Sequence, residues 1–308
     1  MFKHFLNMAL RHFRKDWLYT LINIIGLTLG LALVYFIIIF VSKEYSWNTM
    51  HEYRNSSYRI LVTNTDWTEP LAAFPLGPAL TEDLPEVVAY SRIGGTRMSA
   101  LDKNEHEIRT MAYGADQGIF DIFSFNILRG DRDKLLASKE DAVISKQLAD
   151  VLYPDENPLG KELRLAGRNV DLSLTINGVF ENQPSNSTFR PDVMYSAEWA
   201  AEYYGTLFRD SSYMTNFRTG SFQTYFRLKE GVTQKDFQEK LKLIEDQDLI
   251  DLVGRNLVAI RCALLETSYK EEIIGVSPQE NDSISLEEAL LENYAKTLKN
   301  IVFLKRLM

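Results

Sequence analysis

The feature that most constrains this chain is an apolar run from Leu18 to Val41, LYTLINIIGLTLGLALVYFIIIFV, which has no charged residue in 24 positions. About 20 apolar residues, each rising about 1.5 Å, cross the hydrocarbon core of a bilayer. A cleaved signal peptide has a shorter apolar stretch, of about 7–15 residues, followed by small residues. Because VSKEYSW follows here, the run predicts an uncleaved transmembrane helix over residues 18–41.

Charge is distributed unevenly on the two sides of this span. Residues 1–17 carry a net charge of +3 and the later residues carry −11, which together give the −8 of the 308-residue chain. Basic residues next to a span stay on the cytoplasmic side. The pattern therefore predicts a bacterial inner (plasma) membrane protein with a cytoplasmic N-terminus and a periplasmic main domain. An acidic exterior also argues against nucleic acid as a partner.

Two further patterns flank or lie within the span. Asn23, Gly26 and Gly30 fall on one helical face, where small residues allow close approach of another helix and the amide can hydrogen-bond across the contact. Ahead of the span, residues 1–17 predict an amphipathic cytoplasmic helix that lies on membrane lipid or against a cytoplasmic partner, and the sequence does not separate these two roles. Its apolar face contains Phe2, Phe5, Leu6, Phe13 and Trp17.

The remaining sequence predicts an α+β domain on a short stalk. Residues 42–57 continue the membrane helix outward as the stalk, and residues 58–250 interleave helices with strands, several of them antiparallel neighbours. Strands are expected near 58–64, 86–95, 141–145 and 222–228, hairpins turn near 102–104 and 166–169, and helices begin at Pro75 and after the N-cap Thr233. The aromatic stretch at 119–125 is expected to pack in the core rather than form a ligand pocket.

The segment LYPDENPLGKELRLAG, residues 152–167, raises the possibility of a phosphate-binding loop. Such a loop needs a glycine five positions before the Gly-Lys pair and a hydroxyl residue after it. Here Asp155 and Glu162 occupy those positions. The segment is therefore interpreted as a turn that joins a helix to a strand.

Residues for other chemistry are also missing from the sequence. The single cysteine, Cys262, excludes an intrachain disulfide, and the four histidines form no metal-ligand pair. The sequence contains no nucleophile elbow and no zinc-protease motif. We therefore expect no catalytic residues, no cofactor and no metal, and a chain that is not an enzyme.

Several segments, in this order, resemble the MacB/FtsX-type permeases of ABC transporters. They are GLTLGLA in the span, EYSWNTMHEYRNSSYRI after it, GPALTEDLPEVVAYSRI, YGADQGIFDIFSFNILRGD, AVISKQLADVLYPDENPLGKELRL, INGVFENQPSNSTFRPDVMYS and YFRLKEGVTQKDFQEKL. Together they extend over residues 1–245. The resemblance implies a MacB-like periplasmic core domain with a mixed α/β part and a β-rich inserted lobe.

The resemblance also implies a function. Such permeases do not hydrolyse ATP; a cytoplasmic ABC ATPase subunit does, and the periplasmic domain moves in response and drives efflux across the membrane. Expected partners are this ATPase, a permease homodimer or complementary permease chain, membrane lipid and an envelope partner. The alternative is a membrane-anchored periplasmic binding or scaffold domain without transport activity.

The sequence departs from these permeases after residue 245. Family members have further spans there, whereas residues 251–308 form a divergent segment with an amphipathic helix capped by Ser285 and Glu288. The expectation is a permease that is truncated, split or divergent.

Overall fold

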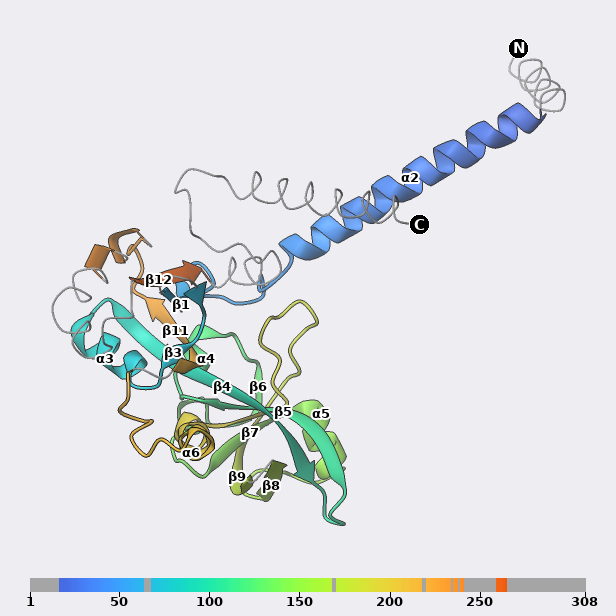
Figure 1. Ribbon diagram of the computed structural model, residues 1–308. Helices are drawn as coiled ribbons and strands as arrows, with labels where there is room; N and C mark the ends of the chain where they lie inside the picture. Colours follow the sequence, from blue (N-terminus) through green and yellow to red (C-terminus); the bar gives the residue numbers. More distant parts are fainter. Residues whose placement is uncertain are drawn as a thin grey trace. The chain divides into compact units, whose positions relative to one another are not determined.

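A computed structural model describes residues 17–63, 68–167, 170–217, 220–233, 235–237, 239–240 and 259–264 of the chain (Figure 1). The chain divides after Trp47 into two compact units, the first containing the N-terminal helix and the second beginning at Asn48. The expected helix over residues 1–17 falls outside the described residues except for Trp17.

The first unit contains the helix α2, Trp17–Tyr45, which has 29 residues. It is the one helix among the described residues that is long and apolar enough to cross a membrane. None of its residues is buried, so its apolar side chains are open to a surrounding medium or another helix. The helix extends past Val41 and ends at Tyr45.

The second unit is a sheet of twelve described strands with four described helices of four or more residues. The strands are β1 (Ser57–Thr63), β2 (Thr68–Glu69), β3 (Ala72–Ala73), β4 (Val87–Leu101), β5 (Glu107–Ala115), β6 (Ile127–Gly130), β7 (Asp141–Ser145), β8 (Glu162–Gly167), β9 (Val170–Phe180), β10 (Val193–Ser196), β11 (Gly220–Leu228) and β12 (Ala259–Leu264). The helices are α3 (Leu76–Asp83), α4 (Ile119–Ile122), α5 (Lys146–Leu152) and α6 (Ala197–Phe208), with the short 3₁₀ turn η1 (Arg132–Lys134). The expected class, an apolar N-terminal helix followed by a mixed helix and strand domain, is confirmed.

The main sheet runs in the order β12-β1-β11-β4-β5-β10-β7-β9-β6. Strand β8 pairs with both β4 and β9, so that the neighbours β4, β5, β10, β7, β9 and β8 form a closed ring. Most neighbours are antiparallel, and the pairs β5–β10 and β7–β9 are parallel. This ring is the β-rich part of the domain.

Three hydrophobic clusters form the core. The first combines the ring strands with α5 and α6 and contains Met98, Ile144 and Leu165. The second surrounds α4 and contains the expected residues Ile119, Phe120, Ile122, Phe123 and Phe125, all of which are buried. The third lies between β1, β11 and α3. The packing interpretation of the aromatic stretch at 119–125 is therefore confirmed.

Local expectations are met where a short-range signal specified them. The β4–β5 hairpin turns at Asp102, whose carboxylate accepts from the backbone N–H groups of Asn104 and His106. Helix α3 begins directly after Pro75, and the Thr233 hydroxyl accepts from the N–H of Asp236 as an N-cap does. The sheet continues past residue 250, because β12 pairs with β1 over Ala259–Leu264.

Candidate functional site: the segment that enters the domain

The candidate functional site is the segment Asn48–Glu52, through which the chain enters the folded domain. It is here called the entry segment. Only Ser46 and Trp47 separate it from the last residue of α2, Tyr45. A short stalk was expected over residues 42–57, and within this range Asn48 is 0% exposed and His51 is 2% exposed. The chain therefore becomes part of the folded domain almost as soon as the helix ends.

Asn48 is fixed by its backbone and its side chain to one loop of the domain. Its N–H donates to the carbonyl of Asn186 at 2.9 Å. Its side-chain Oδ1 accepts from the backbone N–H of Thr188 at 3.0 Å and from the Thr188 hydroxyl at 3.1 Å. The φ angle of Asn48 is +55°, a left-handed conformation that asparagine tolerates better than other residues with a side chain.

His51 is fixed to a second loop, which follows α4. Its Nδ1 accepts from the backbone N–H of Ser124 at 3.2 Å, and its ring meets the Phe123 ring edge-on with the centroids 5.1 Å apart. Its Nε2 is buried and has no hydrogen-bond partner among the described residues. Burial disfavours the imidazolium form and lowers the pKa of His51 to about 4, so the ring is neutral at pH 7.

Ser124 connects the entry segment to both loops. Its N–H donates to His51, its hydroxyl accepts from the N–H of Glu52 at 2.8 Å, and its carbonyl accepts from the Gln183 amide at 3.4 Å. The Gln183 contact joins this loop to the segment that holds Asn48, and the carbonyl of Asn126 accepts from the N–H of Glu181 at 2.9 Å. The two loops and the entry segment thus form one hydrogen-bonded unit.

Aromatic rings that pack next to this hydrogen-bonded unit extend its contacts into the hydrophobic core. Phe123 packs against Phe189 at 5.3 Å and against Tyr225 at 5.2 Å, both measured between ring centroids. Tyr225 belongs to β11 and Phe189 follows the loop that holds Asn48. Close packing of aromatic side chains leaves little room for independent movement. Displacement of Phe123 therefore displaces parts of two other elements.

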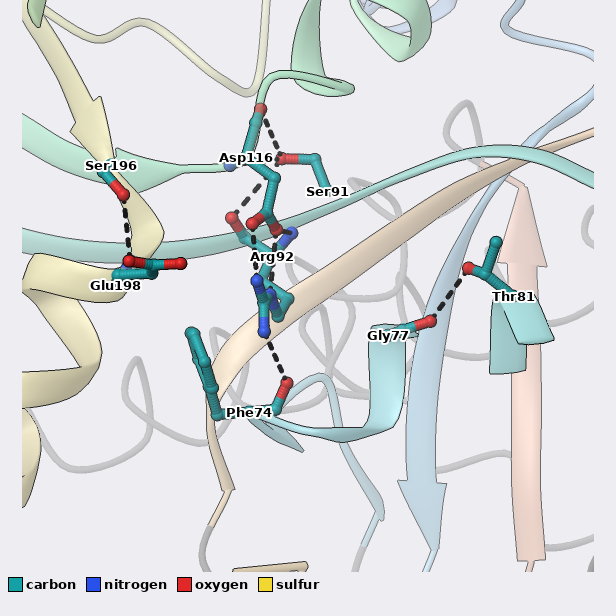
Figure 2. A network of polar contacts seen from close by, with 8 residues as sticks. All are labelled: Phe74, Gly77, Thr81, Ser91, Arg92, Asp116, Ser196 and Glu198. Atoms are coloured by element: carbon teal, nitrogen blue, oxygen red, sulfur yellow. Dashed lines mark hydrogen bonds and ion pairs between the residues drawn. The ribbon is translucent and has the colours of Figure 1, made fainter. Parts of the chain in front are cut away.

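At its other end, α4 is fixed by a partly buried ion pair (Figure 2). The Arg92 guanidinium binds both carboxylate oxygens of Asp116, at 2.6 and 2.9 Å, and the backbone N–H of Arg92 donates to the same carboxylate at 2.7 Å. Arg92 also donates to the carbonyl of Phe74 and stacks on its ring at 3.7 Å. The Ser91 hydroxyl accepts from the N–H of Asp116 at 3.2 Å. This network joins α4 to β4 and to the segment before α3.

Gly118 completes this arrangement. A Cβ atom at this position would lie 2.1 Å from the carbonyl oxygen of Tyr90, so only glycine allows the start of α4 to pass this close to β4. The helix is therefore in backbone contact with β4 at one end and with the entry segment through Ser124 at the other. This is the arrangement of a short rigid connector.

The loop 152–162 has the structural role expected for it. Gly160 adopts φ +75° and donates its N–H to the carbonyl of Ile176. The Lys161 ammonium pairs with Glu156 and lies 4.7 Å from the centroid of the Tyr153 ring. Lys103 binds the same carboxylate at 2.6 Å, and the two lysines lower the pKa of Glu156 to about 2. Lys161 is therefore occupied within its own loop and does not face a phosphate site.

The other site residues predicted from the sequence lie on α2 or outside the described residues. Asn23, Gly26 and Gly30 lie on the exposed helix α2, and a Cβ atom at either glycine would meet nothing within 4 Å. Trp17 is the first residue of that helix and is 63% exposed. The other four, Phe2, Phe5, Leu6 and Phe13, lie outside the described residues. Across the described ranges no group of His, Cys, Asp or Glu side chains could hold a metal ion.

Comparison with known proteins identifies the family. The family model described as the MacB-like periplasmic core domain matches residues 20–244. The chain belongs to this family. Its domain is thus the periplasmic core domain of a MacB/FtsX-type ABC transporter permease, and with its apolar N-terminal helix the chain is a membrane-anchored protein. None of the curated proteins compared with the chain matches it.

One solved structure shares the fold of this chain, and two others superpose with lower scores. A domain assigned to a permease protein from Porphyromonas gingivalis superposes with a TM-score of 0.56 at 21% identity, covering 70% of this chain and 91% of its own. The periplasmic region of MacB from Actinobacillus actinomycetemcomitans gives a TM-score of 0.48 at 13% identity, with 72% and 94% covered. The extracellular domain of the noncanonic ABC-type transporter YknZ from Gram-positive bacteria gives 0.47 at 14% identity, with 67% and 99% covered.

Sequence reasoning did not find Asn48, His51 or Ser124 as functional residues. The segment EYSWNTMHEYRNSSYRI was noted because it resembles the family, but nothing in its spacing indicated burial. The signal in this segment that could have indicated a site was the position of uncharged polar residues directly after the span. Those residues become a site only through contacts with residues 72–140 positions away.

Proposed function

We propose that this chain is a permease subunit of a MacB/FtsX-type ABC transporter that transmits ATP-driven movement of its membrane helix to its periplasmic domain and so contributes to export. A separate cytoplasmic ABC ATPase subunit would hydrolyse the ATP. The observation that supports this proposal most strongly is the entry segment, in which Asn48, three residues after the helix ends, and His51 are buried and hydrogen-bonded to the domain.

A connection of this kind suits mechanical transmission for a physical reason. A flexible linker takes up the movement of one part without moving the other. Here the displacement of Tyr45 would reach Asn48 through two intervening residues, and Asn48 and Ser124 hold the entry segment to two separate loops. The ion pair of Arg92 and Asp116 then joins α4 to β4. Movement at the helix would therefore reorient the sheet instead of being lost in a loop.

The membrane helix would take part in this role by packing against another membrane-spanning helix. We propose that Asn23, Gly26 and Gly30 pack against a helix of a permease homodimer or of a complementary permease chain. Supporting this, the two glycines are four residues apart on an exposed helix face, and small residues at this spacing allow another helix to approach closely. The basic residues before the helix favour a cytoplasmic N-terminus, near the ATPase and the anionic inner leaflet.

Hydrogen exchange in the assembled complex tests this proposal. The full chain is purified from its native membranes after mild cross-linking, and an ABC-type ATPase is expected among the proteins that co-purify. Exchange is then compared between the vanadate-trapped and the ADP-bound complex. We expect changed exchange in residues 48–54 and 119–126, and no change when the ATPase carries a substitution of its phosphate-binding lysine.

The alternative, a tethered binding or scaffold domain, predicts a different result. In that case no ATPase co-purifies, or exchange in the periplasmic domain is the same in both nucleotide states. Orientation is tested separately with single cysteines in place of Lys3 and Glu230 in a Cys262→Ser background. A membrane-impermeant maleimide is expected to label only the second from the periplasm, and labelling of the first would contradict the proposed topology.

A further inference from the structure

Strand β12 pairs with β1 more extensively than the other described strands do. It lies opposite all of Tyr58–Thr63, whereas β11 pairs with β1 only over Ser57–Arg59 and β2 only at the C-terminal end of β1. Ile60 and Leu61 therefore pair with β12 and with no other described strand. In the order of the sheet, β12 stands at one end and is hydrogen-bonded to β1 alone.

The backbone groups of β1 that face β12 follow from one hydrogen bond on the opposite side of the strand. The N–H of Leu228, on β11, donates to the carbonyl of Ser56 at 2.8 Å. Along an antiparallel strand, the N–H and carbonyl groups of successive residues point alternately to the two sides. Ser56 points towards β11, so the even-numbered residues of β1 do so as well. The odd-numbered residues Arg59, Leu61 and Thr63 therefore point towards β12.

These backbone groups lie in a buried part of the domain. Arg59 is 3% exposed and Leu61 is 6% exposed. Buried N–H and carbonyl groups need partners, and a sheet edge without partners readily pairs with another strand. The pairing with β12 thus satisfies groups of β1 that no other described strand reaches.

Strand β1 is also the first strand after the entry segment. Successive turns connect the two: the N–H of Arg54 donates to the carbonyl of His51, and the N–H of Ser56 donates to the carbonyl of Tyr53. Any contact that keeps β1 in the sheet therefore also fixes the C-terminal end of the entry segment.

These observations give β12 a role in the connection between the entry segment and the sheet. We propose that Ala259–Leu264 acts as a strap, which binds the edge formed by Arg59, Leu61 and Thr63 and so keeps β1 in the sheet. Release of the strap opens this edge and loosens the turns that lead from the entry segment to β1. The proposal concerns contacts within the domain and does not depend on the transport role.

Cross-linking through the single cysteine of the chain tests the pairing. Cys262 lies opposite Ile60 in a pair that exchanges no hydrogen bonds, and the Cα atoms of such pairs are about 4.5 Å apart, a separation that a disulfide can bridge. Ile60→Cys in the full chain in nanodiscs is therefore expected to form an intrachain disulfide on mild oxidation. Leu61→Cys is the matched control and should form none, because adjacent side chains of a strand point to opposite faces.

A second pair of cysteines covers the case in which Ile60→Cys does not fold. Val62→Cys with Ile260→Cys, in a Cys262→Ser background, joins the next pair of the same kind and should also give an intrachain disulfide. Absence of the disulfide in folded protein would overturn the proposal. A disulfide-linked dimer would overturn it as well, because the strand would then come from a second copy of the chain.

Proline variants test whether the strap holds β1. Arg261→Pro removes the N–H that faces Leu61, whereas Cys262→Pro removes an N–H that faces away from β1, where an edge strand tolerates proline. Hydrogen exchange of residues 53–63 should accelerate about tenfold in the first variant and stay unchanged in the second, with β4 and β5 unchanged in both. Equal exchange of residues 53–63 in the two variants would contradict the proposal.

A peptide added to the proline variant tests the edge as a binding site. A synthetic peptide of residues 257–266, at about 1 mM under reducing conditions, should restore slow exchange of residues 58–63 in Arg261→Pro, because it fills the edge that the altered strand leaves open. A scrambled peptide of the same composition should not. If neither peptide restores slow exchange, or both do so equally, the edge does not recognise this strand and the proposal is wrong.

Discussion

Two polar clusters in this domain differ in charge and in burial. In the entry-segment cluster, Asn48 and His51 are buried and Ser124 is partly buried, and its hydrogen bonds join segments far apart in the chain. The cluster of Lys103, Glu156 and Lys161 consists of charged side chains that are between 32% and 62% exposed. Water can replace the contacts of the second cluster but not those of the first.

This difference shows which contacts can transmit a displacement. A buried hydrogen bond that is broken leaves an unsatisfied group, so the structure keeps it and moves as one body. An exposed ion pair breaks and re-forms in water at little cost. The contacts of Asn48 and His51 with the domain therefore differ from those of the exposed cluster because they are shielded from water.

The largest effect is expected for the ion pair at the far end of α4, in which Arg92 is buried and Asp116 is partly buried. Asp116→Ala leaves the Arg92 guanidinium buried without its carboxylate, and loss of one partner of a buried pair costs about 3–5 kcal/mol. Urea unfolding of the full chain in detergent measures this free energy. Asp121→Ala removes an exposed carboxylate from the same helix and serves as the control. If the two variants unfold at the same urea concentration, loss of the Asp116 carboxylate costs no more unfolding free energy than loss of the exposed Asp121 carboxylate, and the prediction is wrong.

A somewhat smaller effect is expected at Asn48. Asn48→Ala removes the acceptor for Thr188 and places alanine at φ +55°, which together should cost about 3 kcal/mol of unfolding free energy. Asn48→Gly loses the same acceptor but tolerates the backbone, so it should be more stable than the alanine variant by about 1 kcal/mol. Equal stability of the two variants would contradict a strained left-handed conformation at this residue.

A pH dependence of similar size is expected from His51. Its pKa is about 4 in the folded chain and about 6.5 when unfolded, so below pH 6.5 the unfolded state binds the proton first. The contribution of this group is complete above pH 6.5 and is lost as the pH falls towards 4, by up to about 3 kcal/mol. Carboxylates titrate in the same range, so His51→Leu is the comparison, and its stability should fall less steeply between pH 6.5 and 4. Parallel pH profiles would exclude a buried neutral histidine.

The smallest effect is expected for the exposed cluster. Lys161→Ala removes one of the two lysines that hold Glu156, and we expect the urea midpoint at pH 7 to stay within experimental error of the original. A second measurement in 1 M salt should give the same result for both chains, since salt screens exposed pairs. A large loss of stability in Lys161→Ala would mean that the loop 152–162 depends on this contact, and would remove the contrast with the entry segment.

Much of the fold could be predicted from the sequence because its signals are local. The apolar run at 18–41, the hairpin turn at Asp102 and the aromatic stretch at 119–125 each specify their structure through neighbouring residues. The functional segment could not be predicted in this way. The burial of Asn48 and His51 depends on Thr188 and Ser124, which are distant in the chain. The strand β12 was missed for a similar reason, since its pairing with β1 spans about two hundred residues.

The central claim, that the entry segment and the two loops move as one unit, is tested most directly by hydrogen exchange of the full chain in nanodiscs. Exchange is followed in residues 48–54, 119–126 and 184–190, with and without Asn48→Gly. If the three segments open together, the substitution should accelerate exchange in all three by a common factor of about ten for each 1.4 kcal/mol lost, and Lys161→Ala should accelerate none. Acceleration confined to residues 48–54 would show that the segments open independently and would contradict the claim.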